Sequence, residues 1–322
     1  MKPGTALVLI GLAACSHGDA FVVPTFGTDQ PFQPGAPARL TYSAHSDSEA
    51  TWLPDGSAIL YSAYRPDFPD TTTCLELLPP GGGQAYRSLC PLAPALPDST
   101  RAYQAAAVSA AGQLLYLRSA RMSPNLGWSV RQLVLTTLAA PASVRVVLAS
   151  PFVGYNGLSQ IRWLDEHRFV FRADNYYLIF PCPTCHPIEA DTGLYLVAGD
   201  LSTDPPSLTE LPGTVGATSV AAADSGAVLF TLSGDSVVYR EVVATGAISA
   251  EWNFGFGTVA GAVQLAGTRL AALVNGRIVT VDLASRTTTV VDTLVWTDLA
   301  LSPDGTRLVA QRGGDLWLFG LP

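Results

Sequence analysis

The stretch ATWLPDGSAILYSA, residues 50–63, returns near the other end of the chain as DLALSPDGTRLVAQ, residues 298–311. Each copy places alternating apolar residues on both sides of an Asp-Gly pair, which is the pattern of a β-hairpin. The Asp carboxylate can accept hydrogen bonds from nearby backbone amides, and Gly adopts positive φ without steric cost. The recurrence of one hairpin phrase predicts a repeat architecture.

Four weaker copies lie between these two. The turn positions of the six copies are Gly56, Gly112, His167, Gly226, Gly267 and Gly305. A second pair of alternating segments follows each hairpin, as in RQLVLTTL with SVRVVLA, which gives four strands per unit. A four-stranded unit that recurs along a chain buries its faces by stacking around an axis. We therefore expect an all-β fold, a six-bladed β-propeller of four-stranded antiparallel blades spanning residues 38–322.

The last unit predicts how the ring closes. Its sequence ends GDLWLFGLP at residue 322, which supplies a third strand and no fourth. The segment ARLTYSA, residues 38–44, precedes the first hairpin and has the alternation of a strand. We expect this N-terminal strand to join the last blade.

The repeat also carries a family resemblance. The residues WLPDGSAILY from Trp52 to Tyr61 and SPDGTRL from Ser302 to Leu308 resemble the WD40-like repeat of TolB-type propellers. The resemblance implies the propeller fold over about residues 38–322. It implies little about function, because such blades occur in peptidase gating domains, lyases and binding proteins alike.

Composition excludes some partners. The chain has 322 residues, a formal net charge of -8 and 14% charged residues. Lys2 is the only lysine among 18 basic residues, and the arginines form no cluster. An acidic chain without a basic stripe is not expected to bind nucleic acid.

The first residues indicate export. An apolar run from Ala6 to Ala14 is too short to span a membrane and has the shape of a secretory signal. Leu12 to Cys15 resemble a bacterial lipobox, which implies a signal peptide over residues 1–14, lipidation of Cys15 and a tether over residues 15–37. Ser16 favours the outer membrane. The alternative is an ordinary signal peptide with an incidental Cys. We expect an extracytoplasmic protein, anchored to the cell envelope only through its lipid and otherwise a monomer.

Four further cysteines predict two disulfides in an oxidising compartment. Cys74 and Cys90 flank a Pro-Gly turn centred on Gly82, and Cys182 and Cys185 lie in PCPTCHP. That segment also has the Cys-x-x-Cys-His spacing of c-type haem attachment, with His186 as the ligand, and a zinc site is a further alternative. Three prolines and the lack of a nearby further ligand favour a disulfide. We expect no cofactor and no metal.

The predicted binding face comes from the connections between strands. Long loops follow the second strands of the first three units, whereas the last three have short turns. Long loops on a rigid scaffold are where binding residues concentrate, and aromatic, Arg and Asn side chains are typical of binding sites. The candidates are Tyr64, Arg65, Phe68, Trp128, Tyr155, Asn156, Tyr176, Tyr177, Trp252 and Phe254. The alternative is that these aromatic residues pack the loops down or plug the channel mouth.

Catalytic signatures are sparse. The sequence has no Gly-x-Ser-x-Gly nucleophile motif and only four histidines. Carboxylates in the long loops could form an acid pair; they are Asp67, Asp70, Asp174, Glu189 and Asp191. We expect a non-enzymatic lipoprotein that binds another envelope protein or a polysaccharide. The alternative is a propeller hydrolase or lyase, or a haem carrier that uses Cys182, Cys185 and His186.

Overall fold

The structure is a computed structural model. It describes residues 37–42, 46–64, 71–82, 85–89, 101–121, 129–149, 157–179, 188–223 and 226–322. Within these ranges the regular elements are strands, apart from one short 3-10 turn, η2 (Pro212–Thr214). No helix in this part of the chain is long and apolar enough to cross a membrane.

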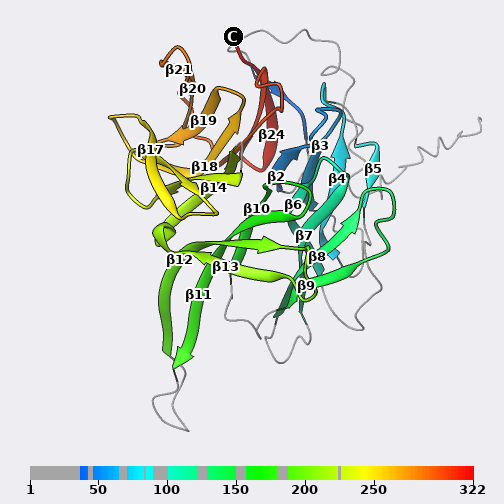
Figure 1. The fold of residues 1–322 in the computed structure, drawn as a ribbon. Helices are drawn as coiled ribbons and strands as arrows, with labels where there is room; N and C mark the ends of the chain where they lie inside the picture. Colours follow the sequence, from blue (N-terminus) through cyan, green and yellow to red (C-terminus); the bar gives the residue numbers. More distant parts are fainter. Residues whose placement is uncertain are drawn as a thin grey trace, which may run out of the picture.

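Three four-stranded sheets run in chain order, and every neighbouring pair of strands in them is antiparallel (Figure 1). The first consists of β10 (Gly157–Trp163), β11 (Arg168–Ile179), β12 (Ile188–Asp200) and β13 (Ser207–Leu211). The second consists of β14 (Ala217–Ala223), β15 (Ala227–Leu232), β16 (Val237–Val242) and β17 (Ala247–Asn253). The third consists of β18 (Val259–Ala266), β19 (Arg269–Val274), β20 (Arg277–Asp282) and β21 (Thr287–Asp292).

A fourth sheet joins the two ends of the chain. It contains β22 (Asp298–Leu301), β23 (Arg307–Arg312), β24 (Asp315–Gly320) and, at its outer edge, β1 (Ala38–Arg39). Ala38 lies opposite Leu318, and the amide of Leu40 donates to the carbonyl of Leu316 at 2.8 Å. The predicted closure by the N-terminal strand is confirmed, although the strand itself is only two residues long.

The remaining strands form one eight-stranded sheet, where the sequence predicted two separate blades. The strands are β2 (Asp47–Trp52), β3 (Ile59–Tyr64), β4 (Thr71–Leu78), β5 (Arg87–Ser88), β6 (Arg101–Val108), β7 (Gln113–Arg121), β8 (Ser129–Thr137) and β9 (Arg145–Ala149). β5 covers β4 only at Glu76 and Leu77. The uncovered part of β4 pairs in parallel with β6, because an open strand edge is a template for pairing. Four separate four-stranded sheets are therefore seen among the described residues, and a count of six is not confirmed.

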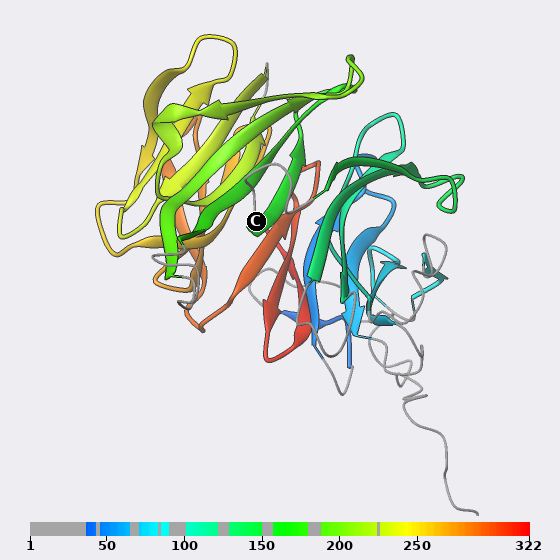
Figure 2. The same ribbon diagram turned by 90° about the horizontal axis from the view of Figure 1, so that it is seen from below.

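The sheets surround a central axis. Their first strands contact one another in the order β2, β6, β10, β14, β18 and β22, and β22 contacts β2 again. Seen from below, the closing sheet in red lies between the blue strands that begin the fold and the orange strands of the sheet before it (Figure 2). The protein is an all-β propeller of four-stranded antiparallel blades. The region along the axis between the first strands is called the central channel.

The quoted hairpin phrases form the turns that the sequence predicts. Gly56 and Gly305 have φ of +70° and +68°. The Asp304 carboxylate accepts a hydrogen bond from the Thr306 amide at 3.0 Å and one from the Ser302 hydroxyl. These donors stabilise the ionised carboxylate and lower the pKa of Asp304 to about 2.

Trp52 ties the first hairpin to the last sheet. Its side chain is buried, and its indole Nε1 donates to the carbonyl of Ala300 at 3.1 Å. We expect Trp52→Phe to lower the free energy of unfolding by about 1–3 kcal/mol, since a buried carbonyl loses its partner. Chemical denaturation measures this. Trp252→Phe is the control, because the Nε1 of Trp252 has no hydrogen-bond partner among the described residues. Equal losses in the two variants would contradict the role of the Trp52 hydrogen bond.

Candidate functional site in the central channel

Five of the ten predicted binding residues lie outside the described part of the chain. These are Arg65, Phe68, Trp128, Tyr155 and Asn156, together with Cys15, Cys90, Cys182 and Cys185. Cys74 is buried in β4 and disulfide-bonded. Its pairing with Cys90 and the bridge between Cys182 and Cys185 stay predictions.

The described members of the predicted set lie in or next to β3, β11 and β17, and their sharing of one surface stays a prediction. Tyr64 ends β3, and Tyr176 and Tyr177 lie in β11 opposite Asp191 and Ala190. Phe254 is only 7% exposed and belongs to the core between two sheets. This corrects the expectation for Phe254, because a buried ring offers no area to a partner.

Trp252 also packs against that core. Its ring is partly buried, and the Arg286 guanidinium lies over it at 5.1 Å from the ring centre. The ring is therefore covered on one side by the protein's own arginine. This placement favours the alternative that these aromatic residues stabilise the blades.

A different set of residues is distinguished by its backbone conformation. Four positions on the first strands have left-handed backbone: Glu49, Ala105, Gln160 and Gly261, with φ of +53°, +47°, +51° and +91°. The pairing register shifts at each of them, so each is part of a β-bulge. A bulge redirects side chains, and left-handed non-glycine residues are found at functional sites more often than elsewhere.

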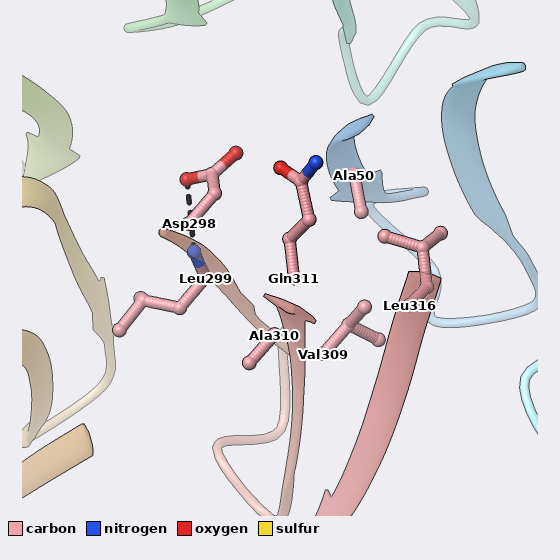
Figure 3. A pocket seen from close by; sticks show the side chains of 7 residues that line it. All are labelled: Ala50, Asp298, Leu299, Val309, Ala310, Gln311 and Leu316. Carbon is pink, nitrogen blue, oxygen red and sulfur yellow. Dashed lines mark hydrogen bonds between the residues drawn. The ribbon is translucent and has the colours of Figure 1, made fainter. Parts of the chain in front are cut away.

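Asp298 is the first residue of β22 and lies opposite Gln311 of β23. The two residues line a small hollow beside Ala50, Leu299 and Leu316 (Figure 3). Their side chains extend side by side in this view. The hollow does not enclose space for a water molecule, so a ligand would contact these side chains from outside it.

The surroundings of Asp298 shift its ionisation. Burial raises the pKa of Asp298 to about 6, against the opposing effects of the Arg162 guanidinium and of the Leu299 amide, which donates to its carboxylate at 2.8 Å. Protein atoms crowd the carboxyl group although the channel leaves part of the residue accessible to water. A carboxyl group with this pKa can take up and release a proton near neutral pH.

Arg162 supplies positive charge to the same channel from β10. Its Nη1 donates to the carbonyl of Ile161 at 2.8 Å, and its buried Nε has no hydrogen-bond partner among the described residues. Burial lowers the pKa of Arg162, and the carboxylates of Asp298 and Glu49 oppose that effect. An arginine stays protonated in proteins, so Arg162 carries a positive charge that acts on Asp298 and Glu49 through space.

Glu49 connects two of the first strands. Its Oε2 accepts a hydrogen bond from the Ala105 amide of β6 at 2.6 Å and one from the Ser62 hydroxyl at 3.3 Å. These bonds fix the carboxylate at the channel wall. Glu49 therefore stabilises the ring and adds negative charge near Arg162.

Gln160 connects three more of the first strands. Its Oε1 accepts from the Val220 amide at 2.9 Å, and its Nε2 donates to the carbonyls of Gly261 at 3.1 Å and Thr218 at 3.4 Å. Both ends of this amide are occupied. The side of the channel beside β14 and β18 is thus fastened by Gln160, and the hollow with Asp298 lies on the other side.

Together, the Asp298 carboxyl group and the Arg162 guanidinium supply a candidate general base and a positive charge. A carboxyl group that ionises near pH 6 can act as a general base, and the positive charge of a nearby guanidinium can stabilise a developing oxyanion through space. No group of three or more His, Cys, Asp or Glu residues in the described ranges could hold a metal ion.

Prediction from the sequence missed these residues, because it placed the binding site in the long loops. One signal could have found it. When the turn positions are aligned, Glu49, Ala105, Gln160 and Asp298 each lie seven residues before Gly56, Gly112, His167 and Gly305. Two of the six repeat copies carry an acid at this one position.

Comparisons with known proteins show the fold of the chain but no family to which it belongs. No family model matches the chain, and no curated protein matches it. Among solved structures, a gluconolactonase from Xanthomonas campestris is similar, with a TM-score of 0.58 and 13% identity over 89% of each chain. This contradicts the prediction that the protein is not an enzyme, because the similar structure is named as one. Identity this low shows the fold alone.

Two further structures bear on the predicted resemblance. TolB from Acinetobacter baumannii has a TM-score of 0.56 and 15% identity, covering 82% of this chain and 64% of that one. The β-propeller domain of Swd1 from Myceliophteria thermophila has a TM-score of 0.54 and 10% identity, covering 89% of this chain and 100% of that one. The resemblance to TolB-type propellers is confirmed at the level of fold.

Proposed function

We propose that the protein is a hydrolase of uncharged esters, lactones included, with its active site in the central channel beside Asp298. The observation that carries this proposal is the partly accessible carboxyl group of Asp298, with a pKa of about 6, on which the positive charge of Arg162 acts through space. The likeness to a gluconolactonase supports an ester substrate. The channel carboxylates of Glu49 and Asp298 disfavour anionic substrates.

The chemistry uses these residues in fixed roles. Ionised Asp298 takes a proton from water, whose oxygen forms a bond to the ester carbonyl carbon. The Arg162 guanidinium stabilises the oxyanion that develops on the carbonyl oxygen. The intermediate collapses with cleavage of the bond to the alkoxy oxygen, which receives the proton from Asp298. The products are an acid and an alcohol, joined in one molecule when the substrate is a lactone.

We also propose six structural units around the channel. The eight-stranded sheet divides at the parallel pair of β4 with β6 into two antiparallel sets, each of which starts with a strand of the inner ring. Two such sets and four separate sheets give six units. The sixfold recurrence of the hairpin phrase supports this count.

The cellular location of the protein is a proposal that rests on the sequence. Export and lipidation at Cys15 would place the propeller outside the cytoplasm, anchored to the envelope. Residues 1–36 lie outside the described part of the chain. An envelope protein or polysaccharide as partner likewise remains a prediction.

The pH dependence of hydrolysis tests the proposed function. With glucono-1,5-lactone and p-nitrophenyl acetate as substrates, we expect kcat/KM to fall about tenfold per pH unit below about pH 6 and to level off above it. The sign follows from the role of Asp298, because only its ionised form accepts a proton. Rates are measured by pH-stat and absorbance, with the enzyme-free rate subtracted. Rates no faster than the enzyme-free reaction with these and other uncharged esters would overturn the proposal.

A further inference from the structure

Two glutamines, Gln160 on a first strand and Gln311 on a second strand, lie at the channel. They differ in the hydrogen bonds that their side-chain amides make. Gln160 is bonded at both ends to β14 and β18. Gln311 makes its hydrogen bonds through the backbone, where its carbonyl oxygen accepts from the amide of Thr297 at 3.0 Å. No hydrogen bond joins the Gln311 side chain to a residue that the structure describes. Its amide is therefore available to a ligand.

The position of Gln311 sets what it can reach. It lies directly opposite Asp298 across the β22–β23 pair, and both side chains point into the same hollow (Figure 3). The other lining residues are apolar: Ala50, Leu299, Val309, Ala310 and Leu316. A pocket with apolar walls and a few polar groups orients its ligand through those groups. Here the uncharged polar group of the wall is the Gln311 amide.

We propose that Gln311 is the substrate-positioning residue of the channel, whose amide binds a hydroxyl or carbonyl oxygen adjacent to the scissile ester. This inference rests on the proposed function, since it assumes that Asp298 acts on the bound ester. The amide can donate to and accept from the same substrate group, which selects neutral oxygenated esters over plain alkyl esters. Gln311 acts through binding and takes no part in proton transfer.

The variant Gln311→Leu tests the proposal because leucine keeps most of the side-chain volume and removes the amide. We expect KM for glucono-1,5-lactone to rise about tenfold, and the ratio of kcat/KM for this lactone to kcat/KM for p-nitrophenyl acetate to fall by about the same factor. A tenfold change corresponds to about 1.4 kcal/mol. Gln264→Leu is the control, since Gln264 lies on first strand β18 and does not line the hollow.

A binding measurement separates this inference from the proposed function. Gluconolactam, in which an amide replaces the ester, is titrated by calorimetry into the wild type and into Gln311→Leu. Tenfold weaker binding by the variant supports the positioning role, even if the wild type hydrolyses no ester, in which case only the hydrolase proposal fails. Equal affinities, or no binding by the wild type, would overturn the inference. If Gln311→Leu does not fold, Gln311→Asn supplies the same test, because it withdraws the amide by one methylene group.

Discussion

Asp298→Asn is expected to reduce kcat/KM for the lactone by about 10²–10⁴-fold, the range that a positioned general base contributes. Asparagine keeps the size of the side chain and can still accept the hydrogen bond from the Leu299 amide. It cannot take a proton from water. The rise of kcat/KM through pH 6 should disappear along with the activity.

The control for this variant is Asp204→Asn, which makes the same chemical change at an exposed position between β12 and β13. Circular dichroism and the midpoint of thermal unfolding show whether each variant is folded. Full activity in Asp298→Asn would exclude Asp298 as the base. A loss of activity in both variants would mean that the measured loss is not specific to the proposed active site.

The second large effect concerns stability, and Asp47 is its source. Asp47 is buried where β2 meets the closing sheet, and its amide donates to the Gly314 carbonyl at 2.8 Å. Burial raises the pKa of Asp47 to about 7, the hydrogen bond from Thr41 opposes this shift, and the carboxylates of Glu76 and Asp315 add to it. Arg39 neutralises Asp315 through an ion pair of 2.5 Å. Where the ring closes, the three carboxyl groups of Asp47, Glu76 and Asp315 thus lie near one arginine, Arg39.

The sign of the pH effect follows from the raised pKa. Because Asp47 binds its proton more tightly in the folded state, its contribution to stability is full below pH 3.8 and is lost as the pH rises to about 7. The shift of about 3 units corresponds to at most about 4 kcal/mol at 1.36 kcal/mol per unit. Asp298 adds a loss of the same sign between pH 3.8 and about 6.

Asp47→Asn should remove the larger part of this slope, since asparagine stays neutral and can still accept the hydrogen bond from Thr41. We expect the variant to be more stable than the wild type by about 2–4 kcal/mol at pH 8 and nearly equal to it at pH 4. Urea denaturation at a series of pH values measures the difference. Asp204→Asn, at an exposed position between β12 and β13, should follow the wild-type curve. Parallel curves for Asp47→Asn and the wild type would show that Asp47 ionises normally.

Local sequence patterns predicted the hairpins because their causes lie within a few residues. The Asp55 carboxylate accepts from the Ser57 amide two residues away, and Gly56 has the positive φ that the turn requires. The closure was predictable for a similar reason, since the last unit lacked an outer strand and residues 38–44 had the pattern of one. Strand pairing between the ends then follows from the need to cover an open sheet edge.

The merging of the first two predicted blades was not predictable from those patterns. It depends on the two-residue length of β5, which leaves Thr71 and Thr73 of β4 open to β6. Local propensity gives no measure of how much of an edge a neighbouring strand will cover. Pairing between segments that are distant in sequence is decided by packing.

The sequence by itself determined that this chain forms four-stranded antiparallel units around an axis and that its N-terminal strand completes the last of them. The tertiary structure alone decided where the chemistry lies. Glu49, Arg162, Asp298 and Gln311 belong to three different sheets, and their ionisation and free donors arise only when the ring brings them together. Burial and Coulomb interactions act through space, so no local pattern could show that Asp298 ionises near pH 6 or that the Nε of Arg162 is unpaired.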